Sequence, residues 1–143
     1  MKTVSWILLV LVGALTLLGS MESAWIALSQ APDGLLGQGL TLVNATVPPE
    51  VALAIRGRRV TAAAYAAAFA VLFLTVVLFP YRRREVWSWW AILVAWLILL
   101  LVTIMRVPML GTRSAVAVGL IQFGIVFIAL LLDVGRLRNR SPL

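Results

Sequence analysis

Three uncharged, apolar stretches of membrane-spanning length constrain this chain more than any other feature. They cover residues 60–79, 86–105 and 114–132. A transmembrane helix needs roughly 20 consecutive apolar residues, because the helix rises about 1.5 Å per residue and the hydrocarbon core is about 30 Å thick. A fourth apolar stretch, residues 4–21, reaches that length when it continues to residue 23 with Glu22 inside it. The sequence therefore predicts four transmembrane helices, at about residues 4–23, 60–79, 86–105 and 114–132.

The lengths of the connections and the apolar share together define the fold class. Apolar residues make up 63% of the 143 residues, whereas a soluble domain is about 45–50% apolar. The connections at residues 80–85 and 106–113 are short, so each joins two antiparallel neighbouring helices. We expect an all-α protein, a four-helix transmembrane bundle in which residues 1–143 form a single transmembrane domain.

The first loop, about residues 24–59, is unusually long and apolar for a small bundle. Within it, Pro48, Pro49 and Glu50 precede a run of apolar residues. Proline and an acid in the first turn are typical of a helix N-terminus. We expect the loop to carry a short interfacial helix that begins there.

Four spans place both termini on the same side of the membrane, and the basic residues indicate which side. The terminus side would hold seven: Lys2, Arg82, Arg83, Arg84, Arg136, Arg138 and Arg140. The opposite side would hold five: Arg56, Arg58, Arg59, Arg106 and Arg113. Because cytoplasmic loops carry an excess of Lys and Arg, we expect a multi-pass protein of the cell inner membrane with both termini in the cytoplasm.

Arginines and tryptophans gather at the second connection. Both residue types are typical of the headgroup region, where arginine meets phosphate and the indole ring lies between water and hydrocarbon. The predicted lipid headgroup contacts are Arg82, Arg83, Arg84, Trp87, Trp89 and Trp90. Since the arginines flank apolar spans, the net charge of +7 indicates membrane lipids as partners rather than nucleic acid.

Two polar residues in or near the spans are candidates for a structural or a functional role. Glu22 should share a membrane level with Arg106 and Arg113, and an ion pair at the non-cytoplasmic boundary is the structural interpretation. Small four-helix multidrug exporters use a glutamate in their first helix, so a proton-coupled role is the alternative, although the long first loop and the late position of Glu22 depart from that family. Gln122 needs hydrogen-bond partners within its span, and the candidates are Thr16, Tyr65, Thr75 and Thr103.

The helix over residues 60–79 has an alanine face. At about 100° per residue, Ala63, Ala67 and Ala70 lie on one side and the larger side chains Tyr65, Phe69 and Leu72 lie roughly opposite. Small residues let helix backbones approach each other closely in lipid, so we expect the alanine face to form a tight helix contact. In the third span, Trp96 lies mid-membrane and is predicted to be a packing residue.

Several residue types that enzymes use are missing or badly placed. The chain has no Cys and no His, which removes thiolate chemistry, the usual metal ligands and the commonest general base. No two carboxylates lie close together within a span, and Asp133, after the fourth span, is expected to form a solvated ion pair with Arg136. We therefore predict no enzymatic activity, no catalytic residues, no metal and no cofactor.

The segment PYRRREVWSWW, residues 80–90, combines an Arg-rich turn, a glutamate and spaced tryptophans. It resembles the second-turn segment of many small bacterial four-helix membrane proteins of unknown function. The resemblance covers about a dozen residues and the layout of the spans. It implies a bacterial origin and a four-helix bundle, and it carries no activity.

These observations predict a non-catalytic integral membrane protein that acts as an accessory or scaffold subunit of a larger membrane assembly. Its partners would be lipids and either other membrane subunits or further copies of itself. The alternative is a small oligomeric transporter or channel, which should gather Glu22, Tyr65 and Gln122 around a hydrated cavity.

Overall fold

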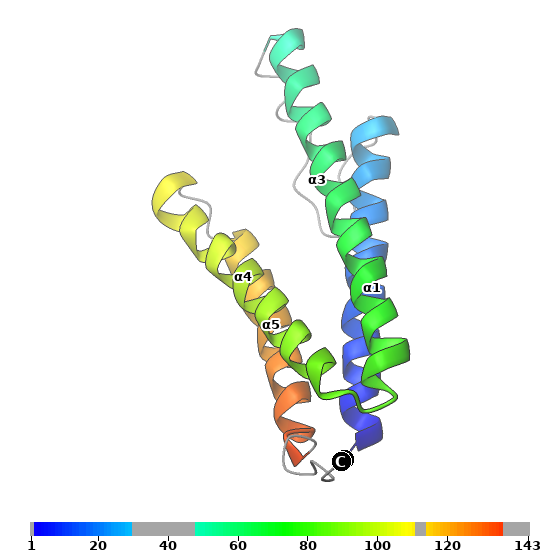
Figure 1. The fold of residues 1–143 in the computed structure, drawn as a ribbon. Coiled ribbons are helices and arrows are strands. Elements are labelled where there is room, and N and C mark those ends of the chain that lie inside the picture. Colours follow the sequence, from blue (N-terminus) through cyan, green and yellow to red (C-terminus); the bar gives the residue numbers. More distant parts are fainter. Residues whose placement is uncertain (1, 30–47, 111–113, 136–143) are drawn as a thin grey trace. The chain divides into compact units, whose positions relative to one another are not determined.

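The described part of the chain is entirely helical. The structure, a computed structural model, describes residues 2–29, 48–110 and 114–135, without the side chains of Lys2 and of residues 106–110 and 114–116. Its four α-helices and one π-helical turn are, in chain order, α1 (Lys2–Ser29), α3 (Pro49–Val76), η1 (Val77–Tyr81), α4 (Val86–Leu110) and α5 (Ser114–Leu132) (Figure 1). No strand occurs among these residues, which confirms the all-α class and the four helices.

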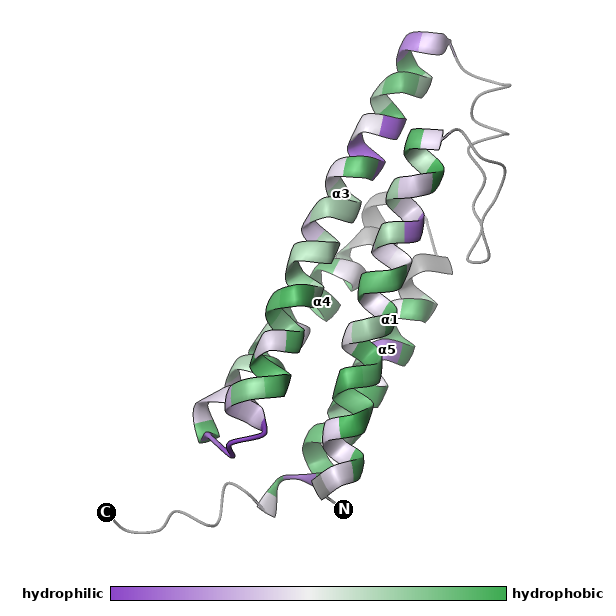
Figure 2. Ribbon diagram, turned by 90° about the vertical axis from the view of Figure 1, so that its right-hand side faces the viewer, coloured by the Kyte–Doolittle hydropathy of each residue, from purple (hydrophilic) through white to green (hydrophobic). Residues whose placement is uncertain are grey.

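Three of the helical segments are long and apolar enough to cross a membrane: Thr3–Ser29, Pro49–Tyr81 and Val86–Met105. The fourth segment that the structure describes, Ala117–Leu132, is also apolar but shorter than a full span. Hydrophobic residues predominate along the helices (Figure 2), and many large apolar side chains are exposed, Leu15, Leu28 and Leu101 among them. Surfaces of this kind are stable in lipid and not in water, which supports a membrane protein.

The helix α1 continues beyond its predicted end at residue 23 to Ser29. Residues 19–23, a more polar segment at the predicted end of the span, remain helical without a break. Ser20 shows how, since its hydroxyl donates to the Leu17 carbonyl of the preceding turn at 2.7 Å. Short hydroxyl side chains can bond to the backbone of their own helix in this way and remain inside it.

The predicted interfacial helix and the predicted second span belong to one continuous helix. The helix α3 begins at Pro49, with Glu50 in its first turn, at the point where the sequence indicated a helix start. It does not stop before residue 60, however, so a separate short helix in the first loop is not confirmed. Arginine is a good helix former, which explains why Arg56, Arg58 and Arg59 do not interrupt the helix.

Pro80 does not end the second span directly, because the helix widens into the π-helical turn η1 and continues to Tyr81. Proline lacks an N–H and its ring collides with the carbonyl four residues earlier. A π turn spaces the backbone differently at that point. The chain then reverses direction through a tight turn in which the Arg83 N–H donates to the Phe79 carbonyl and the Glu85 N–H to the Pro80 carbonyl.

The helix α4 also exceeds its predicted length, ending at Leu110 rather than at residue 105. Pro108 therefore lies within the helix and not in the hairpin that the sequence suggested at residues 106–113. Residues 111–113 of that predicted hairpin lie outside the described residues.

The chain divides into two compact units, Met1–Val12 with Phe73–Leu143 (unit 1) and Gly13–Leu72 (unit 2). In unit 2, α1 and α3 contact each other where Val60 packs against the buried Ile26 and Ala27. In unit 1, Trp96 is buried and its ring packs edge-on against Phe73, with 5.8 Å between the ring centroids. The prediction that Trp96 is a packing residue is thus confirmed.

Candidate functional site

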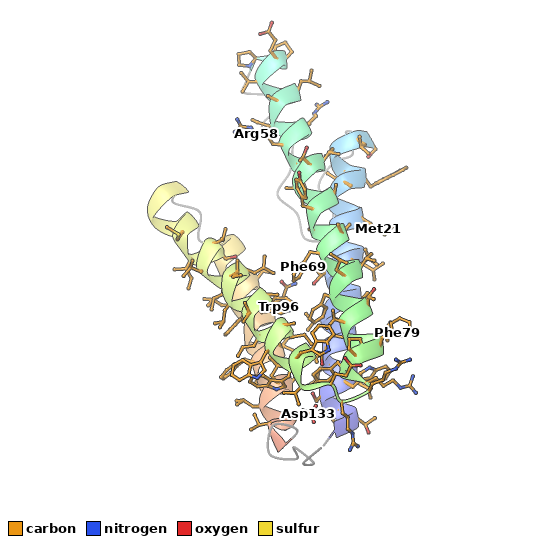
Figure 3. All side chains as sticks on the ribbon, in the orientation of Figure 1. Met21, Arg58, Phe69, Phe79, Trp96 and Asp133 are labelled. Atoms are coloured by element: carbon orange, nitrogen blue, oxygen red, sulfur yellow. The ribbon has the colours of Figure 1, made fainter. Side chains whose placement is uncertain are left out.

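A cluster of buried polar side chains lies at one end of unit 1, and we call it the polar cluster. Its members come from the beginning of α1, the end of η1, the beginning of α4 and the residue that follows α5. They are Ser5, Tyr81, Ser88, Trp89 and Asp133, all of them buried. Figure 3 shows Asp133 at that end of α5.

Ser5 is the centre of the polar cluster. Its Oγ donates to the Ala129 carbonyl at 2.7 Å and lies 2.8 Å from the Tyr81 hydroxyl. A carbonyl can only accept, so the single hydroxyl hydrogen of Ser5 goes to Ala129 and Tyr81 donates to Ser5. One chain of hydrogen bonds therefore joins η1, α1 and α5.

The end of α5 explains why these donors are needed. The Asp133 N–H bonds to the Leu130 carbonyl at 3.1 Å, three residues back, so the last turn of the helix is tightened. At this end of the helix the Ala129 carbonyl accepts a hydrogen bond from Ser5. Leu130 receives a second donor from the Trp89 indole nitrogen at 3.1 Å. Side chains of α1 and α4 thus satisfy carbonyls that every helix C-terminus leaves open.

Trp89 and Asp133 both differ from their predicted roles. Trp89 was predicted to contact lipid headgroups, but it is only 7% exposed and bonds to Leu130 inside unit 1. Asp133 was expected in a solvated ion pair, yet it is 6% exposed. Its expected counter-ion, Arg136, lies outside the described residues. Trp89 of α4 packs against the end of α5, and Asp133 directly follows that end.

The turn between η1 and α4, residues 82–85, presents the predicted headgroup residues. Arg82, Arg83 and Arg84 are all exposed, and Arg84 has a φ of 64°, which is the left-handed region. We call residues 82–85 the arginine turn. It is followed by Trp87 and Trp90, which are both about half exposed, at 54% and 52%.

The expected pairing of Glu22 with Arg106 or Arg113 remains a prediction, because neither arginine side chain lies within the described residues. Glu22 itself is half-buried on α1. The adjacent Ser23 accepts a hydrogen bond from Arg59 Nε of α3 at 3.1 Å. Arg59 is therefore a cation close to this part of α1 that sequence reasoning did not consider, although the topology placed it on the same side as Glu22.

Gln122 is half-buried on α5. Of its four candidate partners, Tyr65 is 75% exposed on α3. Tyr65 therefore points away from the packed side of its own helix. Glu22 and Tyr65 belong to unit 2 and Gln122 to unit 1.

The predicted packing face of α3 is mostly covered. Ala63 and Ala70 are buried, with Ala70 fully so, and Ala67 is half-buried. On the side predicted to be bulky, Tyr65 and Leu72 are exposed and Phe69 is half-buried.

A second set of small residues on α3 was missed at the sequence level. These residues are exposed and alternate at spacings of three and four: Ala54, Gly57, Thr61, Ala64 and Ala68. We call them the small-residue stripe. A Cβ placed on Gly57 would meet no atom within 4 Å, so the surface is open there. The three-four spacing was visible in the sequence, but the richness of this helix in alanine concealed which face would be covered.

No protein-family model, no curated protein and no solved structure matches this chain. Among the described residues, no group of three or more His, Cys, Asp and Glu side chains is arranged to hold a metal ion. The candidate features are therefore those of the molecule itself: the polar cluster, the arginine turn and the small-residue stripe.

Proposed function

We propose that this chain is a non-catalytic, multi-pass membrane protein that serves as an accessory or scaffold subunit of a larger membrane assembly. In this proposal its four helices form one transmembrane bundle in a bacterial inner membrane, with both termini in the cytoplasm. The observation that carries the proposal is the small-residue stripe on α3, which is exposed in the isolated chain.

The physical reason lies in how helices associate in lipid. Apolar bulk does not drive the association, because lipid tails are as apolar as leucine side chains, whereas small residues allow close van der Waals contact between backbones. The alternation of three and four residues keeps the small-residue stripe on one face, as in the seam of a coiled coil. Thr61 and Ala64 follow the charged residues 56–59, so this part of the stripe lies at the beginning of the apolar span. The transmembrane helix of another subunit would fit this face more closely than lipid tails do.

The alternative is a small oligomeric transporter or channel. It requires Glu22, Tyr65 and Gln122 to line a shared hydrated cavity. The exposure of Tyr65, at 75%, favours the accessory subunit, since a cavity-lining side chain would face the inside of the packed helices.

The test is purification from the native membrane in a mild detergent, followed by native mass spectrometry of the intact complex. Ala64→Leu adds bulk to the small-residue stripe. Ala62→Leu makes the same change at an exposed position that is about 200° away around the helix. We expect a different protein to co-purify at fixed stoichiometry and to be lost only with Ala64→Leu.

Two results would count against the accessory subunit. Loss of a homo-oligomer with Ala64→Leu would favour the oligomeric alternative. A chain that is monomeric in the wild type and in both variants would remove the support that the small-residue stripe provides.

A further inference from the structure

The arginine turn carries an inference that is independent of the assembly role. Its three arginines are consecutive and exposed. Among the residues that the structure describes, none of the three arginine side chains forms an ion pair. The Arg82 guanidinium lies 5.7 Å from the centre of the Trp6 ring. Three positive charges are therefore concentrated on one short segment and remain available to an anion.

The backbone of the arginine turn is held in place by its own hydrogen bonds. The N–H groups of Arg83, Arg84 and Glu85 donate to the carbonyls of Phe79, Tyr81 and Pro80, respectively, at 3.0–3.1 Å. Arg84 adopts a φ of 64°, in the left-handed region that is unfavourable for a residue with a Cβ. Glycine would avoid that cost, so the arginine at this position indicates a use for its side chain.

The only acid in the arginine turn, Glu85, forms a hydrogen bond with a tryptophan rather than with an arginine. The carboxylate of Glu85 accepts a hydrogen bond from the indole nitrogen of Trp87. Among the described residues Glu85 forms no ion pair with the neighbouring guanidinium groups, and residues 82–85 keep a net charge of +2. The same contact holds the exposed Trp87 ring next to the arginines.

Large, exposed apolar side chains flank the arginine turn in the sequence. Phe79, Trp87 and Trp90 are each more than half exposed, and Phe79 points away from the helices (Figure 3). A free anion such as inorganic phosphate would use the guanidinium groups alone. A phospholipid would use both features, because its phosphate meets arginine while its glycerol and upper acyl chain meet the aromatic rings.

We propose that the arginine turn, together with Trp87 and Trp90, is a selective binding site for the headgroups of anionic phospholipids. Guanidinium groups form paired, charge-assisted hydrogen bonds with phosphate oxygens. A fixed backbone places three of them at one level, which distinguishes the site from the diffuse attraction of any basic segment to a negative bilayer.

The proposal is tested with the full-length chain in a mild, uncharged detergent. Native mass spectrometry counts bound phosphatidylglycerol, with phosphatidylcholine as the neutral lipid. Each arginine near an anionic surface contributes about a fivefold change in affinity, so replacing Arg82, Arg83 and Arg84 by Gln should weaken phosphatidylglycerol binding about 100-fold. The matched control replaces Arg136, Arg138 and Arg140 by Gln, which removes the same charge from the C-terminal segment and should retain most of the binding.

A second variant guards against misfolding of the triple substitution. Arg84→Gly removes one guanidinium at a backbone position that glycine adopts readily, so the turn should be kept while binding falls about fivefold. Equal losses from the two triple variants would overturn the proposal, because they would show general charge attraction. Equal binding of the two lipids would overturn it as well. If inorganic phosphate competes for the site as strongly as phosphatidylglycerol does, the arginine turn binds free anions and the proposal is wrong.

Discussion

Replacing Ser5 by Ala should destabilise the chain far more than the loss of one small hydroxyl suggests. The substitution changes side-chain volume little, so its effect reports on hydrogen bonds. It removes the donor of the Ala129 carbonyl and the acceptor of the Tyr81 hydroxyl together. Both groups belong to residues of unit 1 with almost no exposed surface, so water cannot replace Ser5.

The magnitude follows from the two groups left without their Ser5 contact. A buried polar group that loses its partner costs about 1–3 kcal/mol. Hydrogen bonds between transmembrane helices average about 0.6 kcal/mol and reach about 1.7 kcal/mol. For two such bonds we expect Ser5→Ala to lower the free energy of unfolding by about 1–3 kcal/mol. That corresponds to a rise of about 5- to 150-fold in the unfolding equilibrium constant.

The chain offers a matched control in Ser20, which is also buried and also donates to a carbonyl at 2.7 Å. Its acceptor, Leu17, belongs to the same helix, so the bond persists when the helices separate within the micelle. Ser20→Ala should therefore change the free energy of unfolding by no more than about 0.5 kcal/mol. The change should be stabilising, because alanine is a better helix former than serine.

The assay is unfolding in mixed micelles with increasing sodium dodecyl sulfate, followed by tryptophan fluorescence. Tyr81→Phe should cost less than Ser5→Ala, because the bond from Ser5 to Ala129 remains. The double variant should cost less than the sum of the two single variants, since all of them act on one chain of bonds. If Ser5→Ala is no more destabilising than Ser20→Ala, the polar cluster does not hold unit 1 together.

Three further predictions concern packing and topology, and the packing variants use the same unfolding assay. A Cβ on Gly119 would lie 2.9 Å from Thr103 Cγ2, whereas one on Gly124 would meet nothing within 4 Å. Gly119→Ala should therefore destabilise the chain, whereas Gly124→Ala should be neutral or stabilising by up to about 1 kcal/mol. Equal effects of the two substitutions would contradict the α4–α5 contact. Ala70 is fully buried, so Ala70→Leu should cost about 1–3 kcal/mol through overpacking, whereas Ala62→Leu at an exposed position should cost little; equal tolerance would contradict the predicted alanine face. Reporter fusions after the last residue and within the first loop should lie on opposite sides of the membrane, with the C-terminal fusion cytoplasmic, and a periplasmic C-terminal fusion would overturn the orientation.

The number of helices could be predicted from the sequence, because the length of an apolar run is set by the thickness of the bilayer. The helix boundaries could not. In α3 the charged residues 56–59 mark where the apolar run begins, and the sequence suggested a helix boundary there. A helix continues wherever its own backbone bonds can form, in lipid or in water. The edge of an apolar run therefore shows where hydrocarbon ends and does not show where a helix ends.

The headgroup residues show a similar limit. The enrichment of tryptophan at membrane interfaces predicts headgroup contacts for Trp87, Trp89 and Trp90 alike. On a helix, Trp89 lies about 200° from Trp87 and about 100° from Trp90, so the three rings cannot all face the same lipid layer. The structure buries Trp89 and exposes the other two. The angular argument could have identified one of the three as a packing residue, although not which carbonyl it would contact.

Ser5 could not have been identified from the sequence as the centre of a site. Its bonds join it to a tyrosine 76 residues away and to a backbone carbonyl 124 residues away. Every residue carries a carbonyl, so no residue pattern identifies the one that a tightened helix end will leave open. A serine within an apolar helix is also common, and most such hydroxyls bond within their own helix, as Ser20 does.

The capping of α5 also determines how the helices of unit 1 are aligned along their lengths. Apolar helices in lipid can slide past one another at little cost, because leucine and valine side chains are nearly equivalent contacts. The donors from Ser5 and Trp89 act on consecutive carbonyls, those of Ala129 and Leu130. A shift of α5 by one turn, about 5.4 Å, would separate both donors from these carbonyls, and each open carbonyl would be costly where water is excluded. The polar cluster therefore selects a single register for α1, α4 and α5 that their apolar surfaces alone would not specify.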